Sequence, residues 1–208
     1  MGRIILFAQQ KGGAGKTMLL TQIAAALAGQ GRSISIVDLD PQRSAAEWHE
    51  TRARAGYSEP TLIESANWRA SSDIQKAAKS SDLTLIDSPG TAEVLRRVAL
   101  RAADFCVVPC QPSAADVWAC RQTLEIIEGE QTEHLVVLNR VPPRSNAADA
   151  ATAELASLGA PVAETTLGSR SAFTEAFMAG AGVTETAPRS KAAAEVMALI
   201  KELHPVFG

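Results

Sequence analysis

The chain has 208 residues, of which 46% are hydrophobic and 21% charged, and its net charge is −3 at pH 7. These values exclude disorder as the default state, and the length fits one α/β domain, residues 1–208, that buries roughly 70% of the surface its unfolded chain exposes. The negative charge excludes a globally basic nucleic-acid binder, although it leaves room for a local basic patch.

The cysteines and the first residues of the chain both indicate in which cellular compartment we expect the protein. The first residues run into an apolar pattern without a basic n-region or cleavage site, and no apolar run approaches the roughly 18 residues of a spanning helix. Cys106, Cys110 and Cys120 are odd in number and lack the Cys-x-x-Cys spacing of metal and redox sites. We therefore expect a cytoplasmic protein whose three cysteines are free, buried and structural.

A glycine-rich loop, QQKGGAGKT at residues 9–17, lies between the apolar run Ile4–Ala8 and an alanine- and leucine-rich helical pattern. This order of strand, loop and helix is the context of a phosphate-binding loop. The glycines let backbone N–H groups turn toward a phosphate, and the helix start adds the positive end of its dipole. Lys16 would place a charge between the β- and γ-phosphates, and Thr17 would offer its hydroxyl to Mg²⁺.

The loop departs from the usual pattern at Gln10, which stands where a glycine is expected, and Lys11 follows it. The resulting Lys-Gly-Gly-x-Gly-Lys-Thr form resembles the deviant Walker A motif of the ParA/MinD family of ATPases. That resemblance implies Mg²⁺-dependent ATP hydrolysis to ADP, with Lys16 and Lys11 catalytic. It also implies a homodimer on ATP in which Lys11 reaches the partner's nucleotide. The nucleotide contacts expected here are Lys11, Gly12, Gly13, Ala14, Gly15, Lys16, Thr17 and Met18.

Two further apolar runs end in acidic residues, at the carboxyl ends of predicted strands, where magnesium or an attacking water is handled. The run 33–37 leads into Asp38-Leu39-Asp40-Pro41-Gln42, and the run 82–86 leads into Asp87. The family resemblance implies that Asp40 positions the hydrolytic water and that Asp87, in a Walker B-like position, holds Mg²⁺. Asp38 would either support the magnesium shell or cap the loop, so the metal candidates are Thr17, Asp38 and Asp87.

Candidates for the adenine base come later in the chain. The predicted strand 134–140 ends in Asn139, whose amide carries both a donor and an acceptor that match the edge of adenine. Arg140 would stack on the ring or face solvent. The loop 167–170 is a second candidate wall, which adds Leu167 and Gly168 as contacts.

The remaining pattern alternates helices and strands. Helices are expected at 18–30, 42–54, 67–79, 91–103, 113–128, 146–158, 171–180 and 191–203, and further strands at 61–64, 104–109 and 161–166. Ser113 is expected to be a helix N-cap, and Trp48 a core residue. These units predict an α/β fold with a doubly wound, mostly parallel sheet and helices on both faces, as in a P-loop NTPase of the deviant Walker A type.

The resemblance is strongest to short plasmid-partition ParA proteins. It implies an ATP-dependent dimerising ATPase that positions or segregates plasmid or chromosomal DNA, or another large cargo, with a small ParB/ParG-like DNA-binding adaptor and non-specific DNA as partners. Nucleoid association would follow. The candidate DNA contacts are Arg170, Arg189, Lys191 and Lys201.

Three alternatives remain at this stage. A MinD-like membrane positioning ATPase would need a basic amphipathic tail, yet the last eight residues are short and interrupted by Pro205, so no membrane anchor is evident. An iron-sulfur carrier would need a pair of cysteines poised at a dimer axis. An ATP-dependent metabolic ligase is compatible with the fold alone.

Overall fold

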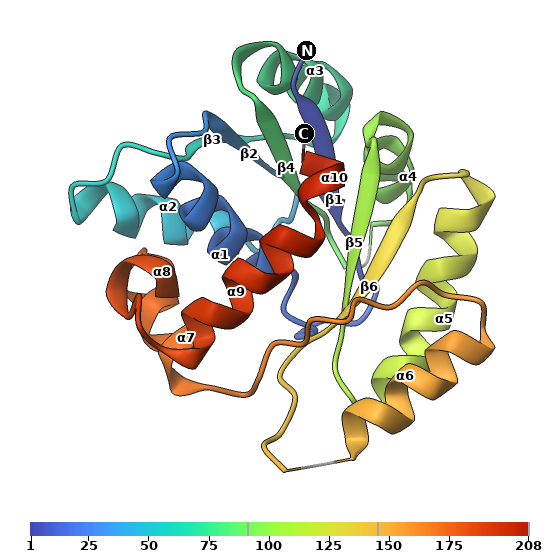
Figure 1. Cartoon of the computed structure of the whole chain (residues 1–208). Coiled ribbons are helices and arrows are strands. Elements are labelled where there is room, and N and C mark those ends of the chain that lie inside the picture. The colour runs from blue at the N-terminus through green and yellow to red at the C-terminus, as the bar shows by residue number, and fades with distance from the viewer. Residues whose placement is uncertain (91, 145, 208) are drawn as a thin grey trace.

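The computed structural model of the protein describes residues 1–90, 92–144 and 146–207, apart from the side chain of Asn67. Six strands form one parallel sheet in the order β3-β2-β4-β1-β5-β6 (Figure 1). The strands are β1 (Arg3–Phe7), β2 (Ile34–Asp38), β3 (Thr61–Glu64), β4 (Leu83–Asp87), β5 (Phe105–Cys110) and β6 (His134–Leu138). β2, β4 and β5 are buried along their whole length, as strands of a sheet covered on both faces must be.

Helices cover both faces of the sheet (Figure 1). One face carries α1 (Lys16–Gly29), α2 (Ser44–Arg54), α7 (Ser171–Met178), α8 (Val183–Thr186), α9 (Lys191–Glu202) and α10 (His204–Phe207). The other carries α3 (Ala70–Ser80) with the 3₁₀ turn Asn67–Arg69 before it, α4 (Glu93–Ala102), α5 (Ala114–Gly129) and α6 (Ala147–Ser157). The predicted doubly wound α/β fold is therefore confirmed.

Each face of the sheet has its own hydrophobic core, because successive residues of a strand point to opposite faces. In β1, Ile5 and Phe7 join the core under α1 and α9, whereas Ile4 and Leu6 join the core under α3 and α4. Trp48 is 1% exposed and belongs to the first core, as predicted. All three cysteines are free and buried, which also confirms the prediction.

The register brings the carboxyl ends of four strands to one level. Phe7 of β1 pairs with Asp87 of β4, Asp87 with Asp38 of β2, and Asp38 with Glu64 of β3. Since the glycine loop follows β1, its backbone leaves the sheet beside Asp87 and Asp38. This edge of the sheet is therefore where phosphate and metal chemistry could meet, at a position typical of open α/β sheets.

The strand predicted at 161–166 is wrong. Val162 forms only an isolated parallel bridge with Val136, flanked by the hydrogen bonds Val136 N to Pro161 O and Ala163 N to Val136 O, both 2.8 Å. The next two N–H groups, of Glu164 and Thr165, instead donate to the carboxylate of Glu202 on α9, at 2.8 and 3.0 Å. The N–H groups that a seventh strand would need for pairing are therefore bonded to a side chain of α9 instead.

Other predicted boundaries differ by a few residues. α2 begins at Ser44 and not at residue 42, because Asp40 to Arg43 form a turn closed by a 2.9 Å bond from Arg43 N to Asp40 O. Between the helices expected at 171–180 and 191–203 lies an additional short helix, α8. The helix predicted from 91 begins at Glu93, and Thr91 itself lies outside the described residues.

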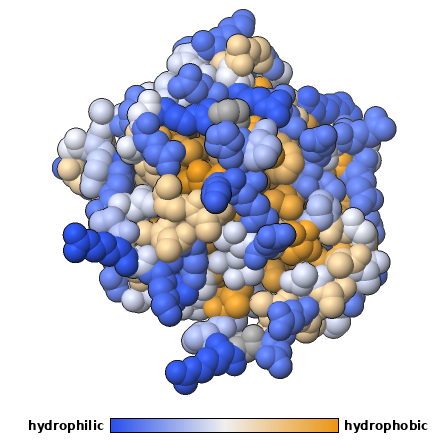
Figure 2. Space-filling model, viewed as in Figure 1, coloured by the Kyte–Doolittle hydropathy of each residue, from blue (hydrophilic) through white to orange (hydrophobic). Residues whose placement is uncertain are grey.

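The surface carries a few large apolar side chains. Figure 2 shows one face, on which hydrophilic residues surround separate hydrophobic areas. The most exposed aromatic side chains are Trp68, at 84%, and Trp118, at 64%. Within the described part of the chain, no helix has both the length and the apolar character to cross a membrane.

Candidate nucleotide-binding site

A cavity of about 930 Å³ opens at the carboxyl ends of the strands. Its wall combines the glycine loop, the turn after β2, the end of β6 and the start of α7. The lining residues include Gln10, Gly12, Gly13, Gly15, Lys16, Thr17, Met18, Asp40, Gly90, Asn139, Arg140, Gly168, Arg170, Phe173 and Phe177. The structure thus brings together the loop and most of the predicted base contacts around one cavity, which has the volume of a cofactor site.

Gly15 fits the loop because no other residue would. Its φ is +97°, and a Cβ at this position would lie 2.3 Å from Nδ2 of Asn139. Lys16 follows as the first residue of α1 and is 7% exposed, with its side chain in the cavity wall. Buried beside the N-terminus of a helix, this ammonium group provides the charge that a phosphate needs.

Thr17 and Asp87 form the most direct contact in the site. The Thr17 hydroxyl donates to Oδ2 of Asp87 at 2.6 Å, whereas Oδ1 of Asp87 is buried and has no hydrogen-bond partner among the described residues. Burial raises the pKa of Asp87 to about 7, although the Thr17 hydrogen bond and nearby Lys16 act in the opposite direction. An orphaned buried carboxylate oxygen beside a hydroxyl is a suitable pair of ligands for a hard cation. The two residues therefore fit the predicted Mg²⁺.

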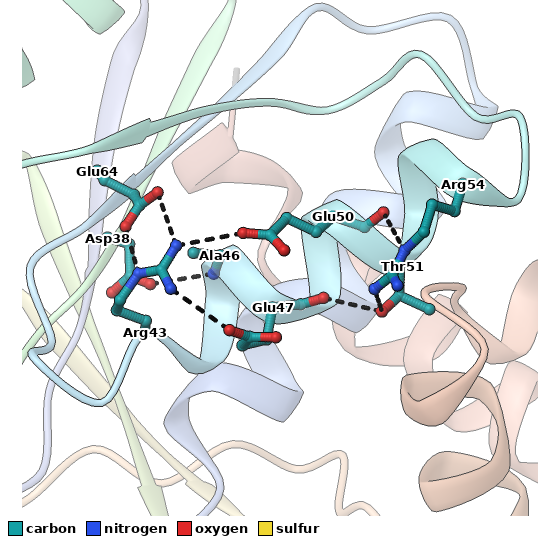
Figure 3. Close-up of polar contacts among 8 residues, drawn as sticks. All are labelled: Asp38, Arg43, Ala46, Glu47, Glu50, Thr51, Arg54 and Glu64. Carbon is teal, nitrogen blue, oxygen red and sulfur yellow. Dashed lines mark hydrogen bonds and ion pairs between the residues drawn. The ribbon is translucent and has the colours of Figure 1, made fainter.

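Asp38 has both carboxylate oxygens engaged by backbone donors. Oδ1 accepts from Asp40 N at 2.9 Å. Oδ2 accepts from Ala46 N, in the first turn of α2, at 3.1 Å (Figure 3). Burial raises the pKa of Asp38, and the two N–H donors oppose that rise. Of the two alternatives for Asp38, this geometry is that of the loop cap.

Asp40 lies in the cavity wall on the turn between β2 and α2, partly exposed. Its Oδ1 accepts from Gln42 N at 3.0 Å, an Asx turn, and its carbonyl accepts from Arg43 N. Within the part of the chain that the structure describes, the second oxygen of this carboxylate accepts no hydrogen bond, so it could contact a ligand at the cavity. This placement is compatible with the water-positioning role, which remains a prediction.

Lys11 points away from the cavity, toward α5. Its Nζ forms a 2.8 Å salt bridge with Oδ2 of Asp116, and Asp116 is in turn bonded by the hydroxyl of Ser113. Ser113 accepts from Asp116 N at 3.2 Å, which confirms it as the N-cap of α5. Sequence reasoning missed Asp116, although its spacing of three from the capping serine was visible.

The predicted base contacts occupy different positions. Asn139 is fully buried, and its amide donates to Ala14 O at 3.0 Å and accepts from Arg140 N at 2.9 Å, so it braces the glycine loop. Arg140 is exposed at the cavity, and Gly168 lines it. Leu167 instead has its side chain in the core, which leaves only its backbone for such a contact.

Two aromatic residues of the cavity were not foreseen. Phe173 and Phe177 stand four apart on α7, so both face the same side of that helix, toward the cavity. Their i, i+4 spacing was readable in the sequence, but the topology that folds α7 over the glycine loop was not. They offer an apolar wall against which a base could stack.

The candidate DNA contacts are not gathered into one patch. Arg170 lies at the cavity, where its Nε donates to Oε2 of Glu195 at 3.0 Å. Arg189, Lys191 and Lys201 are exposed, but the two lysines mark opposite ends of α9, about 15 Å apart at the rise of an α-helix. On a single chain these four residues therefore do not form one continuous basic surface.

Comparison with known proteins agrees with this geometry. The model of the CobQ/CobB/MinD/ParA nucleotide binding domain matches residues 5–183. Maintenance of carboxysome distribution protein A from Halothiobacillus neapolitanus is 29% identical over 205 residues, covering 95% of this chain and 94% of that protein. Protein ParA from Rhizobium radiobacter is 30% identical over 189 residues, covering 85% and 83%.

Among solved structures, the cell division ATPase MinD of Pyrococcus furiosus superposes with a TM-score of 0.82 at 20% identity. That superposition covers 99% of this chain and 100% of MinD, so the whole fold is shared. Together with the glycine loop and its buried lysine, these matches show that the chain belongs to the CobQ/CobB/MinD/ParA nucleotide-binding family and is an ATPase of its ParA/MinD type.

Proposed function

We propose that the chain dimerises on ATP and separates after hydrolysis, and that it uses this cycle to position or segregate DNA or another large cargo. The observation that carries the proposal is the separation of the two lysines of the glycine loop. Lys16 is buried in the cavity wall, whereas Lys11 extends to Asp116 with 40% of its side chain exposed. A lysine at the surface beside the cavity is accessible to a second copy of the chain, as a trans contact requires.

The site residues fit ATP with Mg²⁺. Thr17 and Asp87 are the residues that would hold the ion, and bound Mg²⁺ would neutralise charge on the phosphates. Asp40 would orient the attacking water from the turn after β2. Asn139 would hold the glycine loop while Arg140, Gly168 and Phe177 surround the base.

The nature of the cargo is the finer part of the proposal. One relative is named for carboxysome distribution and another is a ParA, so a protein body and a DNA molecule are both compatible with the family. We propose plasmid or chromosomal DNA as the cargo, with a small ParB/ParG-like adaptor, non-specific DNA as the track and a nucleoid-associated location in the cytoplasm. Dimerisation supports this choice, because it would double the number of exposed basic residues around α9 on one assembly.

The first test separates the two lysines. Lys16→Ala should abolish ATP binding in a calorimetric titration, whereas Lys11→Ala should bind ATP but stay monomeric in sedimentation and hydrolyse none. Lys76→Ala, an exposed lysine on α3, is the matched control and should behave as the wild type. Equal ATP affinity of Lys16→Ala and the wild type would refute the site, and a Lys11→Ala dimer would refute the trans role.

A second test concerns Asp40. Asp40→Ala should accumulate as an ATP-bound dimer, because the attacking water loses its orienting carboxylate. If turnover of this variant stays within about threefold of the wild type, a barrier change below ~0.7 kcal/mol, the role belongs to another residue.

A third test concerns DNA. A fluorescence titration with ATP and with ADP, at low and at physiological salt, should show binding by the ATP form alone, with a log-log salt slope near −0.9 per phosphate contact. Lys191→Glu should weaken DNA binding without changing ATP affinity, and Lys76→Glu should do neither. Equal binding by both nucleotide forms, or no binding at low salt, would point to a protein track.

A further inference from the structure

Arg43 has a backbone conformation that favours glycine. Its φ is +55° and its ψ is 27°, the left-handed region, which is unfavourable for a long side chain. In this conformation its N–H closes the turn on Asp40 O at 2.9 Å, and its carbonyl accepts from Glu47 N at 2.9 Å to start α2. The residue thus converts the turn that carries Asp40 into a helix.

The guanidinium of Arg43 is held by three carboxylates from two elements (Figure 3). Its Nε and Nη2 donate to the two oxygens of Glu64, at the end of β3, at 2.6 and 3.1 Å. Nη2 also reaches Glu50 at 3.2 Å, and Nη1 reaches Glu47 at 3.4 Å, both on α2. We refer to these four residues as the Arg43 clamp. The paired bonds to Glu64 have the bidentate geometry that fixes an arginine in one orientation.

We propose that Arg43 is a positioning residue for Asp40, an inference that rests on the catalytic role proposed for Asp40. The strained backbone at Arg43 persists only if the surrounding contacts hold it, and the clamp supplies those contacts. Glu64 pairs in register with Asp38, whose carboxylate accepts the N–H of Asp40. Asp40 is therefore fixed from two sides, by Asp38 at its N–H and by Arg43 at its carbonyl.

The clamp also spans the edge of the sheet. β3 is the outermost strand beside β2, so Glu64 anchors the turn to the edge of the sheet, and the four clamp residues are not among those that line the cavity. Loss of the clamp would free the turn without removing any residue that lines the cavity. Its effect should therefore fall on the orientation of Asp40 and leave the binding of ATP intact.

The test uses two variants and their combination. Arg43→Gly removes the guanidinium but allows the left-handed backbone, so the turn is free to form. Glu64→Gln removes the anchoring charge at constant size. Arg54→Ala is the matched control, because this exposed arginine ends α2 and contacts only Glu50 O and Thr51 within the part of the chain that is described.

Steady-state ATPase assays should show that Arg43→Gly and Glu64→Gln each lower kcat about tenfold and leave KM for MgATP within about twofold. The double variant should lose no more than either single one, because both remove the same interaction. The ratio of wild-type to Arg43→Gly kcat should shrink as salt rises, since exposed charges are screened. Arg54→Ala should match the wild type throughout.

Hydrogen exchange provides a readout that does not depend on turnover. The amides of Asp40, Gln42 and residue 43 should exchange faster in Arg43→Gly than in the wild type, with no nucleotide present. If the wild type hydrolyses no ATP while this contrast is found, the proposed function fails and the clamp stands. Normal exchange in Arg43→Gly, a KM effect in place of a kcat effect, additive losses in the double variant, or an equal loss in Arg54→Ala would overturn the clamp.

Discussion

Two arginines at the ends of α2 make similar contacts in opposite surroundings. Arg43 precedes the helix with 46% of its side chain exposed, whereas Arg52, in the last turn, has only 3% exposed. Arg52 binds both oxygens of Glu185 at 2.7 and 2.8 Å and Gly180 O at 3.1 Å, and its guanidinium lies 4.1 Å from the ring centroid of Tyr57. A bidentate arginine–carboxylate pair thus holds a surface turn at the start of α2, and another holds a buried contact at its end.

Because the two arginines differ in exposure, we expect them to differ in their contribution to stability. Exposed ion pairs are screened by water and salt and contribute about 0–1 kcal/mol each. Removing one partner of a buried pair leaves an uncompensated charge and costs about 3–5 kcal/mol. Arg52 therefore links α2 to α8 and to Gly180 in the turn before it, and it contributes to stability. Arg43 instead orients a turn and contributes little to the stability of the folded state.

The largest expected effect is at the buried end. Arg52→Ala should lower the free energy of unfolding by about 3–5 kcal/mol, because Glu185 would be left partly buried and unpaired. The control Arg54→Ala, two residues away and exposed, should change it by less than about 0.5 kcal/mol. Urea unfolding with constant m-value measures both. A loss below about 1 kcal/mol for Arg52→Ala would show that the two ends do not differ.

The second effect tests how closely the chain packs on Arg52. Gly180 has a φ of +66°, and a Cβ there would lie 2.3 Å from the backbone nitrogen of Arg52. Gly180→Ala should therefore cost more than the roughly 1–3 kcal/mol of a strained backbone alone. Gly159→Ala is the control, since Gly159 has a similar φ of +75° but open space around it. Equal losses in thermal unfolding would mean that packing on Arg52 adds nothing.

The fold followed from local patterns, and so did the centre of the site. The strands before Gln9, Asp38 and Asp87 are short apolar runs, and parallel pairing alone sends their carboxyl ends to one edge. The glycine loop carries its chemistry within nine consecutive residues. Such features are predictable because the residues that determine them are neighbours in sequence.

The contacts that were missed join residues far apart in sequence. Arg52 and Glu185 are separated by 133 positions, and Lys11 and Asp116 by 105. The strand predicted at 161–166 is wrong for the same reason. Two of its N–H groups donate to Glu202, which lies on a helix about 40 residues later in the chain. Arg43 was missed for a different cause: a left-handed backbone is usually marked by glycine, and here the clamp carboxylates hold an arginine in its place.

A smaller effect is expected from salt, which should weaken the exposed ion pair of Arg43 more than the buried ion pair of Arg52. At low ionic strength, Glu64→Gln should lower the free energy of unfolding by less than about 1 kcal/mol, and this loss should largely disappear at 1 M salt, where the Debye length is about 3 Å. Glu185→Gln should keep most of its larger loss, because its partner Arg52 is shielded from solvent ions. Denaturant titrations in urea, at 0.05 and about 1 M NaCl, measure both. If the loss for Glu64→Gln did not change with salt, the Arg43–Glu64 pair would behave as a buried ion pair, and the prediction would be wrong.

The smallest effect is the pH dependence of the Arg43 clamp. The hydrogen bond and charge of Arg43 lower the pKa of Glu64 below its usual value of 4.5. A carboxylate with a lowered folded-state pKa contributes stability that is fully present above its unfolded pKa and is lost as pH falls through the folded one. The difference in unfolding free energy between the wild type and Glu64→Gln should therefore be constant from neutral pH down to about 5, and it should be lost as pH falls further through the lowered folded-state pKa of Glu64.

Asp87 and Glu130, whose pKa values are also shifted, are present in both proteins and cancel in the difference. Asp38 contributes to the difference, because the charge of Glu64 is among the causes that raise its pKa. Glu125→Gln, which replaces an exposed glutamate on α5, serves as the control. Urea titrations at half-unit steps in pH measure the difference. Because the group is exposed, its whole contribution is small. A difference that grew as pH fell would mean that the charged carboxylate of Glu64 is disfavoured in the folded state despite Arg43, and would contradict the prediction.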